Sequence, residues 1–141
     1  MTTPKEAKHQ VGALPVRTRD GRVEVCLVTT RETRRWTIPK GWPMRGRKDW
    51  TAAGIEAEEE AGLLGAVARK PLGSFLYWKR RLDHLDLIRV DVYRMDVLDQ
   101  MANWKEASER YVMWFPSEVA AEMVEEQGLT QLISSLGESQ G

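Results

Sequence analysis

Four glutamates stand within the five consecutive residues 56–60, directly after a basic, glycine-containing loop. On a helix, residues three and four apart are neighbours, so Glu56, Glu59 and Glu60 would bring three carboxylates within reach of one point. Carboxylates that close repel one another unless a cation lies between them, and Mg²⁺ prefers oxygen ligands that it shares with water and substrate phosphates. The cluster therefore predicts a divalent-metal site. The alternative is a solvated helix face, which is the commonest meaning of a charge run.

The residues before the cluster favour the metal site. Between positions 31 and 48 the only acidic residue is Glu32, against seven basic ones. A positive loop beside clustered carboxylates suits a polyanionic substrate that Lys and Arg hold and that a metal bridges to the glutamates. The basic residues are Arg31, Arg34, Arg35, Lys40, Arg45, Arg47 and Lys48.

A helix must position the glutamates, and its ends can be read from the sequence. Asp49 is placed to act as the N-cap of a helix that starts at Trp50, and Gly62 is placed to end it as a C′ residue. On a helical wheel, small residues form a narrow packing stripe next to the acidic one. That stripe consists of Trp50, Ala53, Ala57 and Ala61.

The segments before the helix are typical of strands. Two β-branched, apolar runs at 10–16 and 23–29 flank Asp20-Gly21, a strong hairpin-turn signal. They predict an antiparallel pair. Residues 34–41 predict a short third strand that Pro39 ends, since proline removes a ladder donor.

More strands and two helices are expected after the acidic helix. Residues 73–82 and 84–97 are aromatic and β-branched and predict longer strands, and 111–115 predicts one more. A helix should start at Pro116-Ser117 and end before Gly128, followed by a short helix over 129–136. This order describes an α+β fold or an α/β/α layered fold with a mixed sheet between helices.

Composition limits the remaining possibilities. The 141 residues suit one domain, 1–141, with flexible termini at 1–8 and 137–141. Lys plus Arg and Asp plus Glu both number 21, so net charge gives no argument for duplex nucleic acid or an anionic membrane. Without a long apolar run or a signal-peptide pattern, we expect a cytoplasmic protein. Cys26 lies in an apolar run, which indicates a buried thiol.

The stretch from Gly41 to Leu63 resembles the Nudix box. The pattern is Gly, five residues, Glu, seven residues, Arg-Glu, a hydrophobic residue, any residue, Glu-Glu, any residue, Gly and a hydrophobic residue. Gly41 opens it, Glu56 fills its second Glu position, Glu59-Glu60 supply the pair and Gly62 closes it, with the spacing kept throughout. Two positions depart: Arg47 replaces the first Glu and Ile55 replaces the Arg, which usually brace the loop and orient the catalytic glutamate.

This resemblance implies an α/β fold, an α/β/α sandwich with a mixed sheet, and a pyrophosphohydrolase activity. The expected cofactor is Mg²⁺ or Mn²⁺, and the expected catalytic residues are Glu56, Glu59 and Glu60, which together with the Gly41 carbonyl would hold the metal. The segments "RRWTIPKG" (34–41) and "MWFPSEVAAEM" (113–123) also resemble family members. The first is similar to the branch that hydrolyses diphosphoinositol and diadenosine polyphosphates, which predicts a small, highly phosphorylated substrate.

Other side chains are candidates for binding and proton transfer. Members of the family draw the general base from different places, so Glu56 and Glu60 are candidates as well as Glu106 and Glu109, which precede the late strand. Trp36 and Trp42 could stack on a base or pack in the core, and core packing is favoured for Trp36. His9 and His84 have no expected catalytic role. The predicted phosphate-binding residues are Lys40, Arg45, Lys79, Arg80 and Arg81.

Three alternatives stay open at this point. The chain could hydrolyse other nucleoside diphosphate derivatives, such as nucleotide sugars. With Arg47 and Ile55 in the box, it could instead be a catalytically weak module that binds a nucleotide. A third reading makes the acidic helix a protein-interaction surface. The sequence does not define the oligomeric state.

Overall fold

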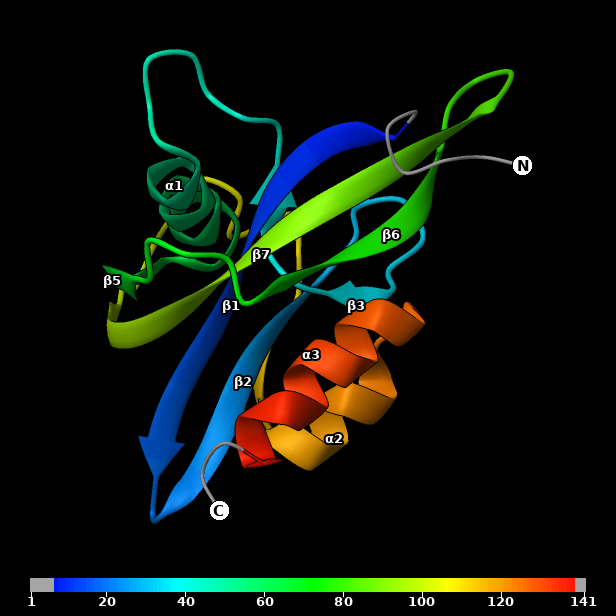
Figure 1. The fold of residues 1–141 in the computed structure, drawn as a ribbon. Helices are drawn as coiled ribbons and strands as arrows, with labels where there is room; N and C mark the ends of the chain where they lie inside the picture. The colour runs from blue at the N-terminus through cyan, green and yellow to red at the C-terminus, as the bar shows by residue number, and fades with distance from the viewer. Residues whose placement is uncertain (1–6, 139–141) are drawn as a thin grey trace.

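The computed structural model describes residues 7–138, which form three helices and a mixed sheet (Figure 1). The first half of the chain contains β1 (Lys8–Arg19), β2 (Arg22–Thr29), β3 (Trp36–Thr37), β4 (Lys40–Gly41), α1 (Asp49–Ala61) and β5 (Leu63–Val67). The second half contains β6 (Gly73–Arg80), β7 (Leu85–Gln100), β8 (Val112–Pro116), α2 (Ser117–Met123) and α3 (Gln127–Glu138). Within residues 7–138, none of the helices is long and apolar enough to cross a membrane.

The predicted hairpin is confirmed. β1 and β2 are antiparallel, and Asp20 and Gly21 between them both have positive φ angles, of 53° and 76°. Two residues with positive φ form the type I′ turn, whose twist matches that of the flanking strands. The hairpin therefore fixes the register of the two strands through Val16 opposite Val25.

The sheet divides where β1 and β2 separate. The C-terminal half of β1 pairs with β2, whereas its N-terminal half pairs with β4 at Val11 and Gly12. Along its other edge β1 runs parallel to β7, and β7 in turn pairs antiparallel with β6 and then with β5. The mixed sheet was predicted, and this division brings the short β4 beside the helix that follows it.

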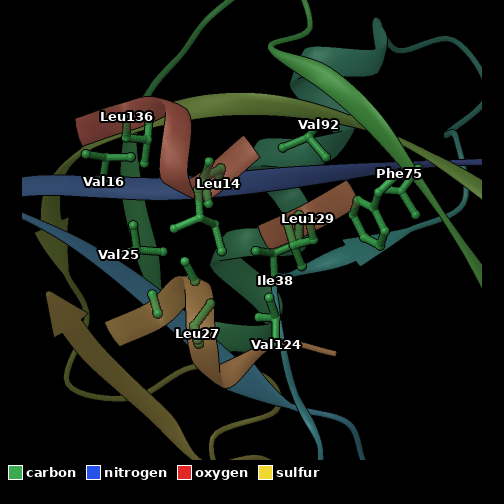
Figure 2. Packing of buried hydrophobic residues seen from close by; sticks show 14 of the residues in the cluster. Leu14, Val16, Val25, Leu27, Ile38, Phe75, Val92, Val124, Leu129 and Leu136 are labelled. Carbon is green, nitrogen blue, oxygen red and sulfur yellow. The ribbon is translucent and has the colours of Figure 1, made fainter. Parts of the chain in front are cut away.

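Helices cover both faces of the sheet, as the α/β/α prediction required. Figure 1 shows α1 on one side and the α2–α3 pair on the other. Because side chains alternate along a strand, β1 sends Leu14 and Val16 to the α2–α3 side and Val11 and Ala13 to the α1 side. Figure 2 shows this packing on the α2–α3 side, where Leu14 lies near Leu129.

Several predicted boundaries were wrong. Asp49 is the first residue of α1 and not its cap; the cap position belongs to Lys48, whose backbone is extended and whose side chain makes no capping hydrogen bond. The predicted strand at 34–41 is two strands, β3 and β4, on either side of Pro39. β5 was not predicted.

The C-terminal helices also differ from the prediction. α2 ends at Met123, and Gly128 lies inside α3 instead of separating the two helices. A Cβ at Gly128 would lie 2.9 Å from the Phe75 Cβ, so the glycine lets α3 approach β6 closely. Of the termini predicted to be flexible, Lys8 starts β1 and residues 137–138 complete α3, while residues 1–6 and 139–141 lie outside the described part of the chain.

The end of α1 depends on Gly62, as predicted. Gly62 has a φ angle of 70°, and a Cβ there would lie 2.5 Å from the Trp104 ring. We expect Gly62→Ala to lower the free energy of unfolding by about 2 kcal/mol, through backbone strain and the clash. Gly137→Ala is the matched control, because it lies in α3 with open space around it and should change stability by less than about 1 kcal/mol. Urea unfolding measures both variants, and equal midpoints would contradict the assigned role of Gly62.

Candidate active site

Small residues hold α1 close to the sheet. Ala53, Ala57 and Ala61 are fully buried and Trp50 packs at the edge of the same cluster, as the predicted stripe required. Ala52 is buried there as well. This packing turns the neighbouring stripe of α1, with Glu56 and Glu60, toward β4 and a cavity at the divided end of the sheet.

Glu56 lies directly against the backbone of Gly41. A Cβ built on Gly41 would come within 2.2 Å of the Glu56 Oε2 atom and 2.5 Å of its carboxyl carbon. Only glycine leaves room for this approach. Gly41 and Glu56, which are 15 positions apart in the sequence, therefore meet at one point, and their role as metal ligands stays a prediction.

Glu56 and Glu60 share a desolvated environment. Glu60 is only 5% exposed, and its burial raises the pKa of its carboxyl group, against the opposing effect of Arg110 and Lys40. Burial and the charge of Glu59 likewise raise the pKa of Glu56, whose carboxyl group also hydrogen-bonds to Glu60. Because Glu60 is buried, its carboxylate is not available to the protein-interaction surface that was the third reading of the acidic helix.

A buried carboxylate, Glu60, and a half-buried one, Glu56, beside a main-chain glycine fit a hard divalent cation. The donors are oxygens, and a cation would compensate for the burial, and for the smaller charge repulsion, that raise both pKa values. Within residues 7–138, His, Cys, Asp and Glu side chains do not gather in a group of three or more arranged to hold a metal ion. Any site here would thus need the Gly41 carbonyl, water or substrate oxygens in addition to side chains.

Glu59 lies apart from the other two glutamates. Its carboxylate is 3.6 Å from the Lys105 Nζ, and it does not belong to the residues that line the cavity. Lys105 is mostly exposed, so this pairing is of the weak surface type. The role of Glu59 as a metal ligand stays a prediction.

The cavity has a volume of about 460 Å³ and a basic wall. That size suits a nucleotide-sized ligand, since ligand pockets usually measure roughly 300–1,000 Å³. Of the predicted phosphate-binding residues, the cavity brings together Lys40, Lys79, Arg80 and Arg81. Arg45 lies exposed on the loop between β4 and α1, outside the cavity, and Figure 1 shows this loop extending away from the sheet.

Lys40 lies deep in this wall. Its Nζ atom is 4.9 Å from the centre of the Tyr77 ring, and Tyr77 donates a hydrogen bond of 2.8 Å to Gln10. Burial lowers the pKa of the Lys40 amine, while Glu60 and Glu126 act in the opposite direction. Lys40 therefore faces the acidic cluster across the floor of the cavity.

Two exposed tryptophans line the cavity. Trp42 follows β4 and is 41% exposed, and Trp78 on β6 is 53% exposed. Trp36, in contrast, packs edge-to-face on Phe115 at 5.2 Å, which confirms its predicted core role. Trp78 was not singled out from the sequence, although alternation along β6 places it on the opposite face to Phe75 and Tyr77.

A segment after β7 contributes residues that sequence reasoning ranked low or missed. Glu106 lines the cavity together with Arg110 and Arg31, whereas Glu109 pairs with the Arg31 guanidinium at 3.1 Å. Of the two loop acids considered as a general base, only Glu106 therefore faces the cavity. Arg110 lies four residues after Glu106 and donates to it at 2.7 Å.

The two departures from the box lie away from the carboxylates. Arg47 is exposed on the loop before α1. Ile55 faces a shallow groove of about 310 Å³ between α1 and β5, which Trp50, Leu64 and Val67 also line. His9 and His84, which had no expected role, pair with Asp91 and Asp83 outside the cavity. Cys26 is fully buried as predicted, and burial raises the pKa of its thiol to about 12.

No family model and no curated protein matches the sequence. Solved structures do share its fold. The chain is similar to an Ap4A hydrolase of C. elegans, with a TM-score of 0.69 and 16% identity over 96% of this chain and 99% of that one. It is also similar to the NUDIX domain of Shewanella oneidensis NrtR complexed with ADP ribose, with a TM-score of 0.72 and 18% identity over 99% and 94%.

A NUDIX hydrolase from Nitrosomonas europaea gives a TM-score of 0.65 and 16% identity over 94% of this chain and 90% of that one. The three matches span nearly the whole of each chain. They agree with the layered architecture that the sequence predicted. The chain therefore has the Nudix fold.

Proposed function

We propose that this protein is a divalent-metal-dependent pyrophosphohydrolase that cleaves a phosphoanhydride bond in a highly phosphorylated nucleotide. The observation that carries the proposal is the contact of Glu56 with the Gly41 backbone, with Glu60 hydrogen-bonded to Glu56, in a cavity with a basic wall. Carboxylates on one side and Lys and Arg on the other match a substrate whose phosphates need both a metal and fixed positive charges.

Glu56, Glu60 and the Gly41 carbonyl would hold Mg²⁺ or Mn²⁺, with Glu59 as a further ligand after release from Lys105. When bound, the cation neutralises charge on the phosphoryl oxygens and makes bound water more acidic. The protein supplies the rest of the chemistry. Its glutamates would fix the position of the cation.

The basic wall would bind and orient the phosphates. Lys40 lies close enough to Glu60 to feel its charge, and Lys79 and Arg80 at the end of β6, with Arg81 just after it, also line the cavity. Glu106 is our candidate general base, because Arg110 occupies its Oε1 atom and leaves Oε2 to take a proton from the attacking water. Such a base contributes about 10²–10⁴-fold to a rate.

Among the substrates considered, the exposed tryptophans favour a nucleotide, and a diadenosine polyphosphate in particular. A purine presents a flat face on which an indole stacks, worth about 1–3 kcal/mol per base, whereas an inositol ring has none. Two of the similar structures are an Ap4A hydrolase and a NUDIX domain bound to ADP ribose. A diphosphoinositol polyphosphate is the second candidate, supported by the Lys79-Arg80-Arg81 run on the wall.

The test is hydrolysis of a substrate panel by the purified protein. The panel holds diadenosine polyphosphates, diphosphoinositol polyphosphates, nucleotide sugars and nucleoside triphosphates, each with Mg²⁺ and then Mn²⁺, with products identified by mass. We expect cleavage of diadenosine polyphosphates that stops when EDTA is added. If the protein binds nucleotides of the panel but cleaves no member of it, the protein is a nucleotide-binding module and the enzyme proposal is wrong.

The tryptophan prediction separates the two substrate candidates. Trp78→Ala and Trp42→Ala should each raise KM for a diadenosine polyphosphate about tenfold and leave kcat nearly unchanged, because stacking holds the base and not the reacting phosphate. Trp78→Phe, which keeps an aromatic face, should restore most of the affinity. Steady-state kinetics measure all three variants, and unchanged KM values in both alanine variants would favour the inositol substrate.

A further inference from the structure

The Arg110 guanidinium joins three separate parts of the chain. Its Nε atom donates to Glu106 Oε1 at 2.7 Å, and its Nη1 atom donates to the Thr29 carbonyl oxygen at 3.0 Å. Its Nη2 atom lies 3.8 Å from Glu60 Oε2. The Arg110 side chain is only 11% exposed, and the two carboxylates are buried to a similar degree. Arg110 is therefore a largely buried cation between two acidic groups of the cavity.

The segment that carries Arg110 is anchored to the end of α1. Its main-chain and side-chain donors reach three carbonyl oxygens there: Glu106 N to Glu59 at 3.0 Å, Trp104 Nε1 to Glu60 at 3.1 Å, and Met101 N to Gly62 at 2.8 Å. A helix leaves its last carbonyls without intrahelical donors, so these bonds satisfy groups that need partners.

The segment is equally fixed at its other end, next to β2. The residue after Arg110, Tyr111, exchanges hydrogen bonds with Thr29: its carbonyl accepts from the Thr29 amide at 3.0 Å, and its amide donates to the Thr29 hydroxyl at 2.9 Å. The backbone on both sides of the guanidinium is thus held by neighbouring elements.

The site needs such a cation, because its acidic groups repel one another. The negative charges of Glu56 and Glu106 both act on the Glu60 carboxylate and disfavour its ionised form. A planar guanidinium can hold two carboxylates and a carbonyl in fixed directions at once, which the single ammonium of a lysine cannot do. Neither Arg47 nor Ile55 is placed for this task, since one is exposed on a loop and the other faces the opposite groove.

We propose that Arg110 is the positioning residue of this site: it fixes the Glu60 and Glu106 carboxylates toward the cavity from the segment after β7. It does so from outside the acidic helix and its preceding loop. This inference rests on the proposed function, because the carboxylates it positions are those assigned to metal binding and proton transfer.

The kinetic test compares Arg110→Gln and Arg110→Lys with a control, Arg17→Gln. Arg17 is a partly buried arginine that also donates to a glutamate at 2.7 Å, but on the β1–β2 hairpin, away from the cavity. We expect Arg110→Gln to lower kcat by about 10–100-fold, the usual effect of a group behind a metal ligand, with KM within about twofold. Arg110→Lys should lower kcat about tenfold, and Arg17→Gln should keep the wild-type kcat.

Two kinetic results would overturn the proposal. A raised KM with an unchanged kcat would make Arg110 a substrate-binding residue. Wild-type values for both constants in folded Arg110→Gln, or in Arg110→Lys if the glutamine variant does not fold, would leave it no positioning role.

A second measurement needs no metal and no substrate. Thermal unfolding in EDTA compares Arg110→Gln and Glu60→Gln with the double variant. Removing Arg110 leaves Glu60 buried beside Glu56 and Glu106, so we expect a drop in Tm on the order of 10 °C. Adding Glu60→Gln should recover more Tm in the Arg110→Gln background than in the Arg17→Gln background. Equal effects in both backgrounds would show that Arg110 and Glu60 are not coupled.

The two measurements separate the failure of this inference from failure of the proposed function. If the wild-type protein hydrolyses nothing on the panel, the function is wrong, yet the unfolding cycle still tests the pairing. If the wild type is active and the Arg110 variants match it, only the positioning role is wrong.

Discussion

Glu60→Gln is expected to lower kcat for phosphoanhydride hydrolysis on the order of 10³-fold, which corresponds to about 4 kcal/mol of lost transition-state stabilisation. The amide keeps the shape of the side chain but removes the negative charge that would hold the cation. Glu56→Gln should have a similar effect, because its carboxylate lies against Gly41 at the same point. Steady-state kinetics with saturating Mg²⁺ measure the loss.

The same helix supplies the control. Glu58 is exposed and faces the groove on the other side of α1, so Glu58→Gln should keep the wild-type kcat. Glu59→Gln tests the assignment of the third ligand and should also lose most activity. If Glu58→Gln loses as much as Glu60→Gln, the effect comes from the charge of the helix as a whole, and the metal-site assignment is wrong.

Stability distinguishes a lost ligand from a lost fold. Burial raises the pKa of Glu60, so in the absence of metal its ionisation costs stability once the pH exceeds the pKa that the group has in the unfolded chain. Glu60→Gln should therefore be at least as stable as the wild type at pH 7 in EDTA. This advantage should vanish below about pH 4, where Glu60 is protonated in both states. Thermal unfolding of the wild type and Glu60→Gln at the two pH values tests the direction of this stability difference.

Gly41→Ala is the second large prediction. The added methyl group would lie 2.2 Å from the Glu56 Oε2 atom, and the flexible end of that side chain must move away. We expect kcat to fall about 100-fold as the carboxylate leaves its position, while Tm changes by only a few degrees. Metal affinity, measured by Mn²⁺ titration, should fall with it.

A double variant checks that the methyl group acts through Glu56. If it does, Gly41→Ala should add little to the loss already caused by Glu56→Gln, because both changes disable the same carboxylate. Fully multiplicative losses would mean that Gly41 acts elsewhere, for example through the course of the β4 backbone.

The sequence predicted those parts of the fold and site that short-range signals specify. The β1–β2 hairpin follows from Asp20-Gly21, and the packing stripe and acidic stripe of α1 follow from helical periodicity. Gly41 and Glu56 lie on opposite sides of one loop, so the box resemblance was enough to place them together. The errors at Asp49 and Gly128 concern helix boundaries, where packing against neighbouring elements overrides local preference.

The rest depends on contacts between residues far apart in the sequence. Arg110 reaches the Thr29 carbonyl across 81 positions, and no spacing rule predicts such a pair. β5 is short and contains Gly65, so its strand character comes from pairing with β7. Trp78 looked like one more aromatic residue of a strand, and its place on the cavity wall depends on distant segments, since the same cavity is lined by residues from Gln10 to Arg110.

The most direct test of the account is the position of the metal. A crystal grown with Mn²⁺ and a non-hydrolysable dinucleotide polyphosphate would locate the cation by its anomalous scattering. We expect a peak within coordination distance of the Gly41 carbonyl oxygen, Glu56 and Glu60, with phosphate oxygens of the ligand in the remaining positions. A peak elsewhere, or a bound ligand without any peak at these residues, would contradict the assignment of the acidic helix as the metal-binding element.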